Sequence, residues 1–427
     1  MGKIIRDPIH NIIEVDRDAL ALIDTEVFQR LRRIRQLGVA WLVYPAAEHS
    51  RFTHSVGTYN MSKCILNNLE KNSVGFQLDK DKKKLVILAG LLHDIGHAPF
   101  SHAFETAIKN LKGDFKHEHM STKIIMECNE ISSKLKKHGK NFPEEICQII
   151  DNKYSDPYVA SIVSSQFDAD RIDYLLRDSY MTGANYGRFD IDWLLKNIRI
   201  EKSTFRHSEG EMVVSIDYKK GLNVLEQYLI GRYFMYTHVY YHRVNRGFEI
   251  VVTNIIKRIL EKKYDNFMGY NYINDLHSGN ISLEDYLKLD DFTVLTWFKD
   301  WYEKTQDFIL KDLLYHLFTR KPYYEVIYPP YGHMEYSEEK EKIMNGFENE
   351  DEKEYYFQED SPKNTAYKDL YNIDEMLEEI YISKNGDVIP LSAIEDSIIT
   401  GAKGVLKKEK ILWYKKRERG NEANGYE

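Results

Sequence analysis

The chain has 427 residues and a formal net charge of −8 at pH 7, with 43% hydrophobic and 30% charged residues. This length predicts two or three packed units at about 150 residues per domain, and no apolar run approaches the ~20 residues that cross a bilayer. The acidic balance argues against a nucleic-acid partner, and three widely separated cysteines cannot form a disulfide framework, so we expect a cytoplasmic protein.

From about Asp18 to Arg320 the sequence predicts one helix after another, because apolar residues recur at spacings of three and four. The exception is “EMVVSID”, whose alternation after the polar turn “RHSEGE” predicts a small β-hairpin with “NIRIEKSTF”. One long helical stretch is predicted from about Lys219 to Lys263. The other predicted helices include “DALALIDTEVFQRLRRIRQLG”, “HSVGTYNMSKCILNNLEK”, “KKLVILAGLLHD”, “EHMSTKIIMECNE”, “PEEICQIIDN” and “DYLLRDSYM”.

The composition changes after Arg320. Residues 321–370 are rich in tyrosine and acid and are interrupted by “PP” and “DSP”, which indicates a peripheral or mobile segment. Residues 371–427 predict a strand, an “NGD” turn, a short helix and a final strand. We therefore predict a mainly α protein with a helical core over 1–320, a peripheral segment over 321–370 and a small α+β tail over 371–427.

The segment “LLHDIGHAPFSH” gathers polar side chains at the end of an apolar helix. His93 and Asp94 offer an imidazole and a carboxylate, ligands that suit a divalent first-row metal. Alone, such a pair is more often a helix cap or a surface feature. His54 in “SRFTHSVG” and Asp170 in “FDADRIDYLLRD” lie at expected helix starts and would complete the ligand set. Such a mixed site leaves positions for water or a phosphate oxygen, as metal-assisted phosphoester hydrolysis requires.

A His, a distant His-Asp pair and a further Asp resemble the signature of the HD-domain phosphohydrolases. The wider match resembles the branch that contains the deoxynucleoside triphosphate triphosphohydrolases and the mammalian SAM-and-HD-domain dNTP hydrolase. The matching segments are “DPIHNIIEVD”, “DTEVFQRLRRIRQLG”, “HSRFTHSVG”, “LLHDIGHAPFSHAFE”, “FKHEH”, “DADRIDYLLRDSYMTG” and “YYHR”. The resemblance implies an HD helical bundle that cuts a dNTP between the α-phosphorus and O5′ and releases inorganic triphosphate. It also implies one divalent ion per site, with Mn, Mg, Fe and Zn all compatible with the ligands.

The resemblance assigns roles to further residues. His97 would face the α-phosphate, His102 would donate a proton to O5′, and His117 would pair with residue 105. The position expected to be aspartate is Glu105 here, whose carboxylate extends one methylene further. The implied deoxynucleotide contacts are Arg51, Gln36, Leu37, Arg171, Tyr174, Asp178, Arg232, Tyr236 and Tyr240.

Among these contacts, Gln36 and Leu37 would line the sugar face and exclude a 2′-hydroxyl. Tyr236 stands where the mammalian enzyme has a histidine, so the phosphate contacts are expected to differ. Taken singly, these tyrosines and histidines are as readily explained as ordinary core or partly exposed residues. Their order along the chain and their motif context favour the functional interpretation.

Four residues near the N-terminus, Lys3, Asp24, Gln29 and Arg32, match a nucleotide activator site at a subunit interface of the same branch. Asp24 would equally serve as the N-cap of the helix beginning “TEVFQRLRR”. The positions for a second, adjoining nucleotide hold Trp193 and Asn197, where arginine and phenylalanine are expected. The resemblance thus implies a homo-oligomer, from dimer to hexamer, with a dNTP or GTP as activator.

Two alternatives remain open. HD sites also serve nucleoside monophosphate phosphatases, cyclic-nucleotide phosphodiesterases and guanosine-tetraphosphate hydrolases. The absence of a “GYP” motif after the His-Asp pair counts against cyclic-di-GMP cleavage. An alternative from another class is a nucleotide-sensing scaffold with a vestigial site, against which the complete ligand set counts.

Overall fold

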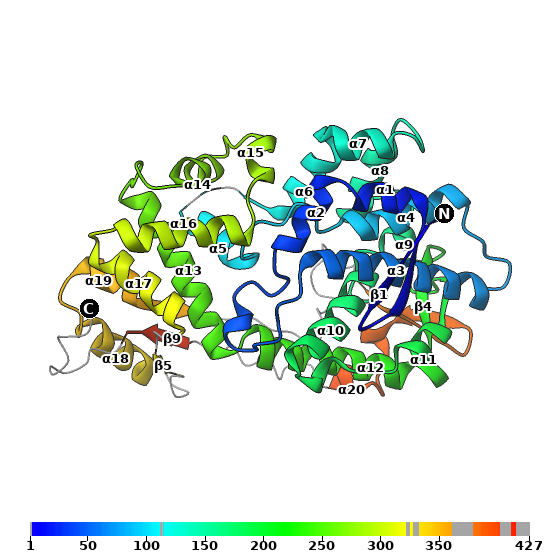
Figure 1. Ribbon diagram of the computed structural model, residues 1–427. Coiled ribbons are helices and arrows are strands. Elements are labelled where there is room, and N and C mark those ends of the chain that lie inside the picture. Colours follow the sequence, from blue (N-terminus) through cyan, green and yellow to red (C-terminus); the bar gives the residue numbers. More distant parts are fainter. Residues whose placement is uncertain are drawn as a thin grey trace.

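The computed structural model describes residues 2–111, 113, 115–321, 325–327, 333–360, 379–401 and 411–415. Over these residues the fold is mainly α-helical, as predicted, with small sheets of two to four strands (Figure 1). Among the described helices, none combines the length and the apolar character needed to span a membrane.

The helices are α1 (Arg17–Ile23), α2 (Glu26–Gln29), α3 (Arg51–Asn72), α4 (Lys80–Leu92), α5 (His102–Asn110), α6 (His117–Glu127), α7 (Asn129–Leu135), α8 (Phe142–Ile150), α9 (Pro157–Ala160), α10 (Ala169–Thr182), α11 (Ile191–Lys196), α12 (Tyr218–Met235), α13 (Arg243–Glu261), α14 (Tyr270–His277), α15 (Leu283–Leu287), α16 (Asp291–Lys304), α17 (Phe308–Thr319), α18 (His333–Met344), α19 (Glu350–Tyr356) and α20 (Ile398–Gly401). Shorter helical turns are η1 (Arg30–Arg33), η2 (Ala40–Leu42), η3 (Asn185–Gly187), η4 (Tyr236–Tyr240) and η6 (Leu391–Ala393). The strands are β1 (Lys3–Asp7), β2 (Asn11–Val15), β3 (Ile198–Lys202), β4 (Met212–Asp217), β5 (Glu325–Ile327), β6 (Phe357–Asp360), β7 (Tyr381–Lys384), β8 (Asp387–Pro390) and β9 (Ile411–Tyr414).

Helix α3 is the central element of the site region, because it packs against both α4 and α10. The antiparallel hairpin of β1 and β2 lies beside α3 and buries Ile13 and Val15 in the main hydrophobic core (Figure 1). Gly57 allows α3 and α10 to approach closely. A Cβ at that position would lie 2.0 Å from Asp173 Oδ1 and 2.3 Å from Arg177 Nη2.

Two predicted long helices are broken. The stretch from Lys219 to Lys263 consists of α12, the π-helical turn η4 and α13. The His242 side chain accepts a hydrogen bond from Val244 N and so starts α13 anew. The segment after Asp18 divides in the same way, because the Thr25 hydroxyl caps α2. Thr25 is therefore the N-cap, and the alternative role for Asp24 as the N-cap is wrong.

The hairpin predicted from “EMVVSID” is confirmed, since β3 and β4 pair antiparallel with Ile198 opposite Ile216. The tail differs from its prediction, because β8 follows the Asn385–Gly386 turn before the short helix α20. Both turn residues have positive φ, which suits an Asn-Gly hairpin turn. The tail strands also join earlier ones: β7 pairs parallel with β4, and β9 lies between β5 and β6.

Part of the segment expected to be peripheral is packed. Tyr355 and Tyr356 of α19 are 0% and 4% exposed, and Tyr355 O accepts a hydrogen bond from Asn254 of α13. The large tyrosine rings supply the apolar surface that the aliphatic-poor segment otherwise lacks. Residues 361–370 of that segment and 371–378 of the predicted tail lie outside the described residues, and the division into three parts stays a prediction.

Candidate active site

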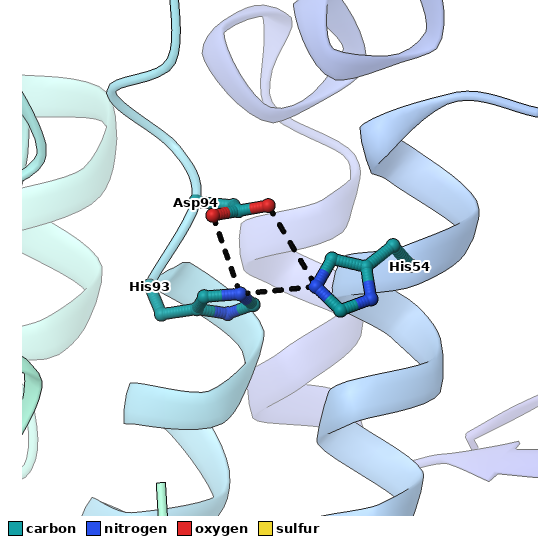
Figure 2. Close-up of side chains that lie close together, drawn as sticks. All are labelled: His54, His93 and Asp94. Carbon is teal, nitrogen blue, oxygen red and sulfur yellow. Dashed lines mark hydrogen bonds and ion pairs between the residues drawn. The ribbon is translucent and has the colours of Figure 1, made fainter. Parts of the chain in front are cut away.

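The candidate metal ligands lie at three helix ends, and Figure 2 shows His54, His93 and Asp94 close together. His54 lies in the first turn of α3, His93 and Asp94 follow the last turn of α4, and Asp170 lies in the first turn of α10. His54 Nε2 is 3.0 Å from Asp170 Oδ1 and 3.2 Å from His93 Nε2. His93 Nε2 is 3.3 Å from Asp94 Oδ1. The structure thus brings His54, His93 and Asp94 together as a group that could hold an ion, and Asp170 lies beside both histidines.

These side chains fit a divalent cation. His54 Nδ1 faces Asp173 Oδ2 at 2.8 Å and His93 Nδ1 faces Gly90 O at 2.9 Å. Both partners are acceptors, so each Nδ1 carries the proton and each Nε2 lone pair faces the shared space. Metal bonds of about 2.0–2.2 Å place neighbouring ligand atoms roughly 3.0–3.5 Å apart, which is the spacing seen here.

The charges around this point also suit a cation. Burial raises the pKa of Asp94, but the charges of His93 and Arg51 outweigh burial and hold it well below 3.8. Burial likewise opposes ionisation of Asp170, and the two histidines lower its pKa nonetheless. Burial lowers the pKa of His54, whereas its hydrogen bonds to Asp170 and Asp173 raise it to about 10. A proton and a metal ion therefore compete for Nε2 of His54.

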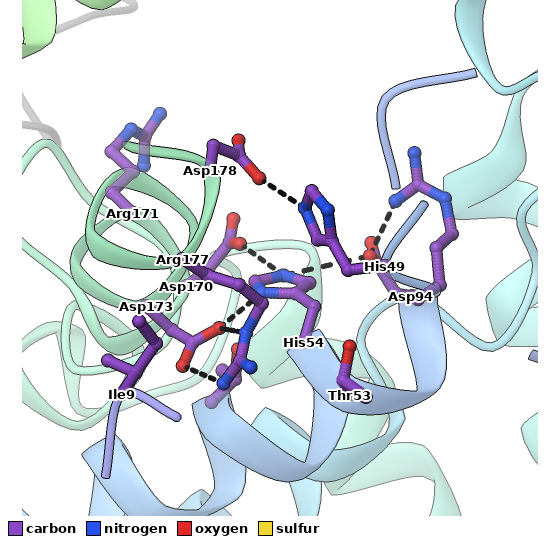
Figure 3. Close-up of polar contacts among 12 residues, drawn as sticks. Ile9, His49, Thr53, His54, Asp94, Asp170, Arg171, Asp173, Arg177 and Asp178 are labelled. Carbon is purple, nitrogen blue, oxygen red and sulfur yellow. Dashed lines mark hydrogen bonds and ion pairs between the residues drawn. The ribbon is translucent and has the colours of Figure 1, made fainter. Parts of the chain in front are cut away.

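Asp173 orients the ring of His54 and was missed by the sequence analysis. Its carboxylate also accepts hydrogen bonds from Arg177 Nε at 2.8 Å, Arg177 Nη2 at 2.9 Å and His10 Nε2 at 2.6 Å (Figure 3). Asp173 follows Asp170 by three residues, so helical spacing alone places both on neighbouring positions of one helix face. That spacing was the available signal.

Side chains from distant parts of the chain hydrogen-bond to the loop that follows Asp94. Arg30 donates to His97 O at 2.8 Å, and Tyr286 donates to Gly96 O at 2.5 Å. Phe100 and Ser101 both have φ near +52°, a strained conformation for residues with side chains. Side chains of distant elements thus support the strained loop through hydrogen bonds to its backbone carbonyls.

Asp291 is the partner that holds this strained loop at its end. Its Oδ1 accepts from Phe100 N at 2.9 Å, and its Oδ2 accepts from Arg35 N at the same distance. Burial raises the pKa of Asp291 to about 6. The side chain therefore joins the loop to the segment after η1.

A second histidine group lies beside the first. His97 Nε2 is 3.1 Å from Asp94 Oδ1, and His117 Nδ1 is 2.7 Å from Glu105 Oε1. The longer Glu105 side chain thus reaches His117. His97, Glu105 and His117 are close enough for an ion, but the two rings stack with centroids 3.8 Å apart and planes at 21°. Nearly parallel rings direct their in-plane lone pairs side by side rather than to one point, so proton sharing suits this group better.

The two stacked histidines have opposite pKa shifts. Burial, reinforced by the charges of Arg51 and His117, holds the pKa of His97 well below 6.5. Burial also lowers the pKa of His117, but the hydrogen bond and charge of Glu105 outweigh it and raise the pKa above 6.5. His102 begins α5, and its side chain lies outside the described residues.

A cavity of about 450 Å³ opens onto these groups. It is lined by the predicted residues Gln36, Leu37, Arg51, Asp94, His97, His117, Asp170, Tyr174, Asp178, Tyr236 and Tyr240. The described lining does not include Arg171, which pairs with Asp168 at 2.5 Å, or Arg232, which lies 5.8 Å from the Tyr236 ring. Among the described residues, Nε and Nη1 of Arg232 are buried with no hydrogen-bond partner.

The sequence analysis missed His49, which bonds to the lining residue Asp178, and Asn245, which lines the cavity. Asp178 accepts from Tyr240 OH at 2.8 Å and faces His49 Nε2 at 2.7 Å. Asn245 donates its amide Nδ2 to Glu249 Oε1 at 3.1 Å, and its buried Oδ1 has no partner among the described residues. No spacing in the sequence marked His49, since its partner Asp178 lies 129 residues further along the chain. Asn245 bonds within its own helix, to Glu249 four residues on, and no motif singled it out.

The predicted activator residues lie near the surface in two pairs. Lys3 Nζ is 3.9 Å from Asp24 Oδ2, with both side chains more than half exposed. Arg32 Nε donates to Gln29 Oε1 at 2.7 Å, and the Arg32 guanidinium stacks 3.4 Å from the centroid of the Phe52 ring. Trp193 is 44% exposed, whereas Asn197 is buried.

Comparisons with known proteins agree with this geometry. Residues 51–178 match the family described as “HD domain”, and residues 198–345 match “HD associated region”. The uncharacterized protein YwfO of Bacillus subtilis is 34% identical over 97% of this chain and 92% of its own length.

Two further likenesses concern named hydrolases. A Dictyostelium discoideum protein named deoxynucleoside triphosphate triphosphohydrolase SAMHD1 homolog is 36% identical over 43% of this chain and 37% of its own length. A solved phosphohydrolase from Bacteroides thetaiotaomicron has a TM-score of 0.76 and 25% identity, covering 98% of this chain and 100% of its own.

Proposed function

The chain belongs to the HD-domain family of phosphohydrolases, and on this premise we propose that it cleaves deoxynucleoside triphosphates to a deoxynucleoside and inorganic triphosphate. The cavity carries this proposal, because the same space is lined by two candidate metal ligands, Asp94 and Asp170, and by the residues expected to hold a deoxyribose. Its volume of about 450 Å³ is within the range of small-molecule sites. The likeness to the Dictyostelium triphosphohydrolase supports the same substrate class.

The site residues would bind the cation and surround it with polar groups. A divalent ion held by His54, His93, Asp94 and Asp170 would polarise the α-phosphate and lower the pKa of an adjacent water. Arg51 reaches Asp94 Oδ2 at 2.5 Å through Nη1 and lines the cavity. It offers donors to a phosphate oxygen in a space from which water is partly excluded. We propose Mn, Mg, Fe and Zn as the ions to be compared.

The triphosphate requires further positive charge. Arg232 fits this need, because its Nε and Nη1 are buried without a partner among the described residues. A buried donor that is left unpaired is costly, and a phosphate oxygen would satisfy it. The Tyr236 ring lines the cavity 5.8 Å from the Arg232 guanidinium, so Arg232 lies next to the cavity wall. Arg171 is already paired with Asp168, so its contact with phosphate would be secondary.

Proton transfer completes the reaction. Water attacks the α-phosphorus, the bond from phosphorus to O5′ breaks, and O5′ takes up a proton. His117, which is hydrogen-bonded to Glu105 at 2.7 Å, would face the charge on the phosphate, while His97 would hold the phosphate beside Asp94. His102 is our candidate donor to O5′.

Selection of deoxyribose over ribose would come from other residues of the cavity lining. Gln36 and Leu37 would pack where a ribose carries its 2′-hydroxyl. The Tyr240 hydroxyl and the Asp178 carboxylate, which are hydrogen-bonded to each other, would contact the 3′-hydroxyl. Steric exclusion suits a site that must reject an analogue with one added group.

Product analysis tests the proposal. Each dNTP, alone and in pairs with the other three or with GTP, is incubated with the purified protein and Mn²⁺ or Mg²⁺, and the products are separated by ion exchange. Deoxynucleoside and triphosphate are expected, and water labelled with ¹⁸O should label the triphosphate. Orthophosphate from dAMP, or opening of a cyclic nucleotide, with no triphosphate from any dNTP would support the alternative phosphohydrolase function instead.

A nucleotide-sensing scaffold is the alternative from another class. The convergence of the four candidate ligands at 3.0–3.7 Å argues against decay of the site. A His93→Ala/Asp94→Ala double variant separates the two cases. If it retains every effect of the native protein on nucleotide pools, the scaffold is favoured.

We also propose a nucleotide-activated homo-oligomer, with Lys3, Asp24, Gln29 and Arg32 at the activator site. The exposed Lys3–Asp24 pair supports a surface site, since both side chains are available to a ligand. Mass photometry with and without each dNTP or GTP, repeated on an Asp24→Ala variant, tests this. A mass that never changes with nucleotide contradicts it.

A further inference from the structure

We propose that His10, in the turn of the N-terminal hairpin, is a positioning residue for the metal ligand His54 and acts through Asp173. The inference rests on the proposed metal site but not on the substrate. His10 Nε2 lies 2.6 Å from Asp173 Oδ1, and Asp173 Oδ2 lies 2.8 Å from His54 Nδ1. One carboxylate on α10 thus connects an imidazole of the hairpin turn with an imidazole of α3.

All three groups are shielded from water. The side chains of His10, His54 and Asp173 are 6%, 1% and 0% exposed. Hydrogen bonds to a charged group are stronger and more directional in such surroundings than at a surface. Because His54 Nδ1 must donate to Asp173, the angle of that carboxylate sets the direction in which His54 Nε2 points.

His10 contributes something that the other partner of Asp173 cannot. Arg177 donates to both carboxylate oxygens, but it lies on the same helix, four residues on, and moves together with Asp173. His10 comes from a separate element, 163 residues away in the chain. It therefore ties the carboxylate to the hairpin rather than to its own helix.

The hairpin turn is built to place His10. Asp7 Oδ1 accepts hydrogen bonds from Ile9 N at 2.9 Å and from His10 N at 3.0 Å, which closes the turn. Asp7 Oδ2 accepts from Arg177 Nη1 at 2.8 Å. Asn11 then takes a positive φ of 58° and starts the return strand. The turn is thus anchored twice to α10, through Asp7 and through His10.

The consequence is a thermodynamic link between hairpin docking and metal affinity. If the docked hairpin improves the geometry of His54, a bound ion must in turn favour the docked hairpin by the same factor. Ile13 and Val15 dock the same hairpin through the hydrophobic core, and they do so without touching the carboxylate. This division supplies a matched control.

The test compares His10→Ala with Ile13→Ala by calorimetric titration of the chelator-treated protein with Mn²⁺. His10→Ala is expected to weaken Mn²⁺ binding about tenfold, at the low end of the effect of outer-shell partners. His10→Gln keeps a side-chain donor and should restore most of the affinity. Ile13→Ala removes a buried side chain and lowers stability, but it should leave Mn²⁺ affinity unchanged.

Hydrogen exchange gives a second readout that needs no activity. Mn²⁺ should slow amide exchange over residues 3–15 in the native protein and in Ile13→Ala, and much less in His10→Ala. Native-like Mn²⁺ affinity in His10→Ala, or an equal loss in Ile13→Ala, overturns the inference. If His10→Ala does not fold, equal Mn²⁺ affinity in His10→Gln and in a His10→Leu variant overturns it.

Metal binding and product analysis together distinguish failure of the metal site from failure of the proposed substrate. Absence of Mn²⁺, Mg²⁺, Fe²⁺ and Zn²⁺ binding by the native protein would remove the metal site and this inference together. A protein that binds Mn²⁺ with the expected His10 dependence but cleaves no dNTP would overturn the proposed substrate alone.

Discussion

His54 Nδ1 lies 2.8 Å from Asp173 Oδ2, and the same oxygen accepts a hydrogen bond from Arg177 Nε at 2.8 Å. This contact leaves His54 Nε2 facing Asp170 Oδ1 at 3.0 Å and His93 Nε2 at 3.2 Å. Two carboxylates therefore act on the His54 imidazole. Asp173 orients the ring through Nδ1, and Asp170 would bind the same metal ion as Nε2.

Metal binding should stabilise the fold. Adding Mn²⁺ to chelator-treated protein at about 100 times its dissociation constant should contribute about 2.7 kcal/mol and raise the melting temperature. His93→Ala should abolish most of the rise, because it removes one of the converging ligand atoms. His119→Ala is the control, since His119 is exposed on α6. Equal rises in both variants, measured by scanning calorimetry, would contradict the ligand set.

Gly57→Ala should lower the free energy of unfolding. Its Cβ would lie 2.0 Å from Asp173 Oδ1, so the buried carboxylate or the helix has to shift, at about 1–3 kcal/mol. The matched control is Gly139→Ala, where the Cβ would meet only the Cβ of Phe142, at 4.0 Å, and the change should stay within about 0.5 kcal/mol. Urea unfolding midpoints compare the two, and a Gly57→Ala protein as stable as the control would refute the close packing.

Glu105→Gln should lower the pKa of His117. In the native protein that pKa is raised above 6.5, so the imidazolium persists above pH 6.5 and is lost as pH rises through the folded-state value. Any stability from this pair is likewise present at low pH and lost over that window. Without the carboxylate the loss occurs at lower pH, and the alkaline limb of kcat/KM should move the same way.

The control for this change is Glu118→Gln. Glu118 Oε2 is 3.4 Å from His117 Nδ1 and its side chain is 52% exposed, so water screens it and the shift should be smaller. NMR titration of the His117 ring proton checks both variants independently of activity. A His117 pKa that rises, or that shifts equally in both variants, would count against Glu105 as the main partner.

Leu37→Ala should relax sugar selection. Removing the side chain opens space where a 2′-hydroxyl is expected to clash, and the ratio of kcat/KM for GTP to that for dGTP should rise roughly tenfold. Val239→Ala also enlarges the cavity, from η4, and should leave the ratio unchanged. Steady-state rates with paired ribo- and deoxynucleotides give the comparison, and equal ratios in the two variants would remove Leu37 from the sugar face.

Much of the helical architecture could be read from the sequence, because the apolar period and the caps are local. The helices containing His54 and Asp170 begin where their motifs indicated. The break between α12 and α13 was not predictable in the same way, since “YTHVYYHR” keeps aromatic residues at helical spacing through the interruption. The π-helical turn and the His242 cap depend on how the two helices pack.

The sequence by itself determined which side chains are candidate metal ligands and placed them at helix ends, because imidazole and carboxylate groups are costly to bury without partners. It also determined the β3–β4 hairpin through strand alternation. Only the tertiary structure decided that His10 and Asp173, 163 residues apart, meet at 2.6 Å and that β9 lies between β5 and β6. Local patterns set the period and the caps of an element, whereas long-range partners arise from the packing of whole elements, which no local pattern encodes.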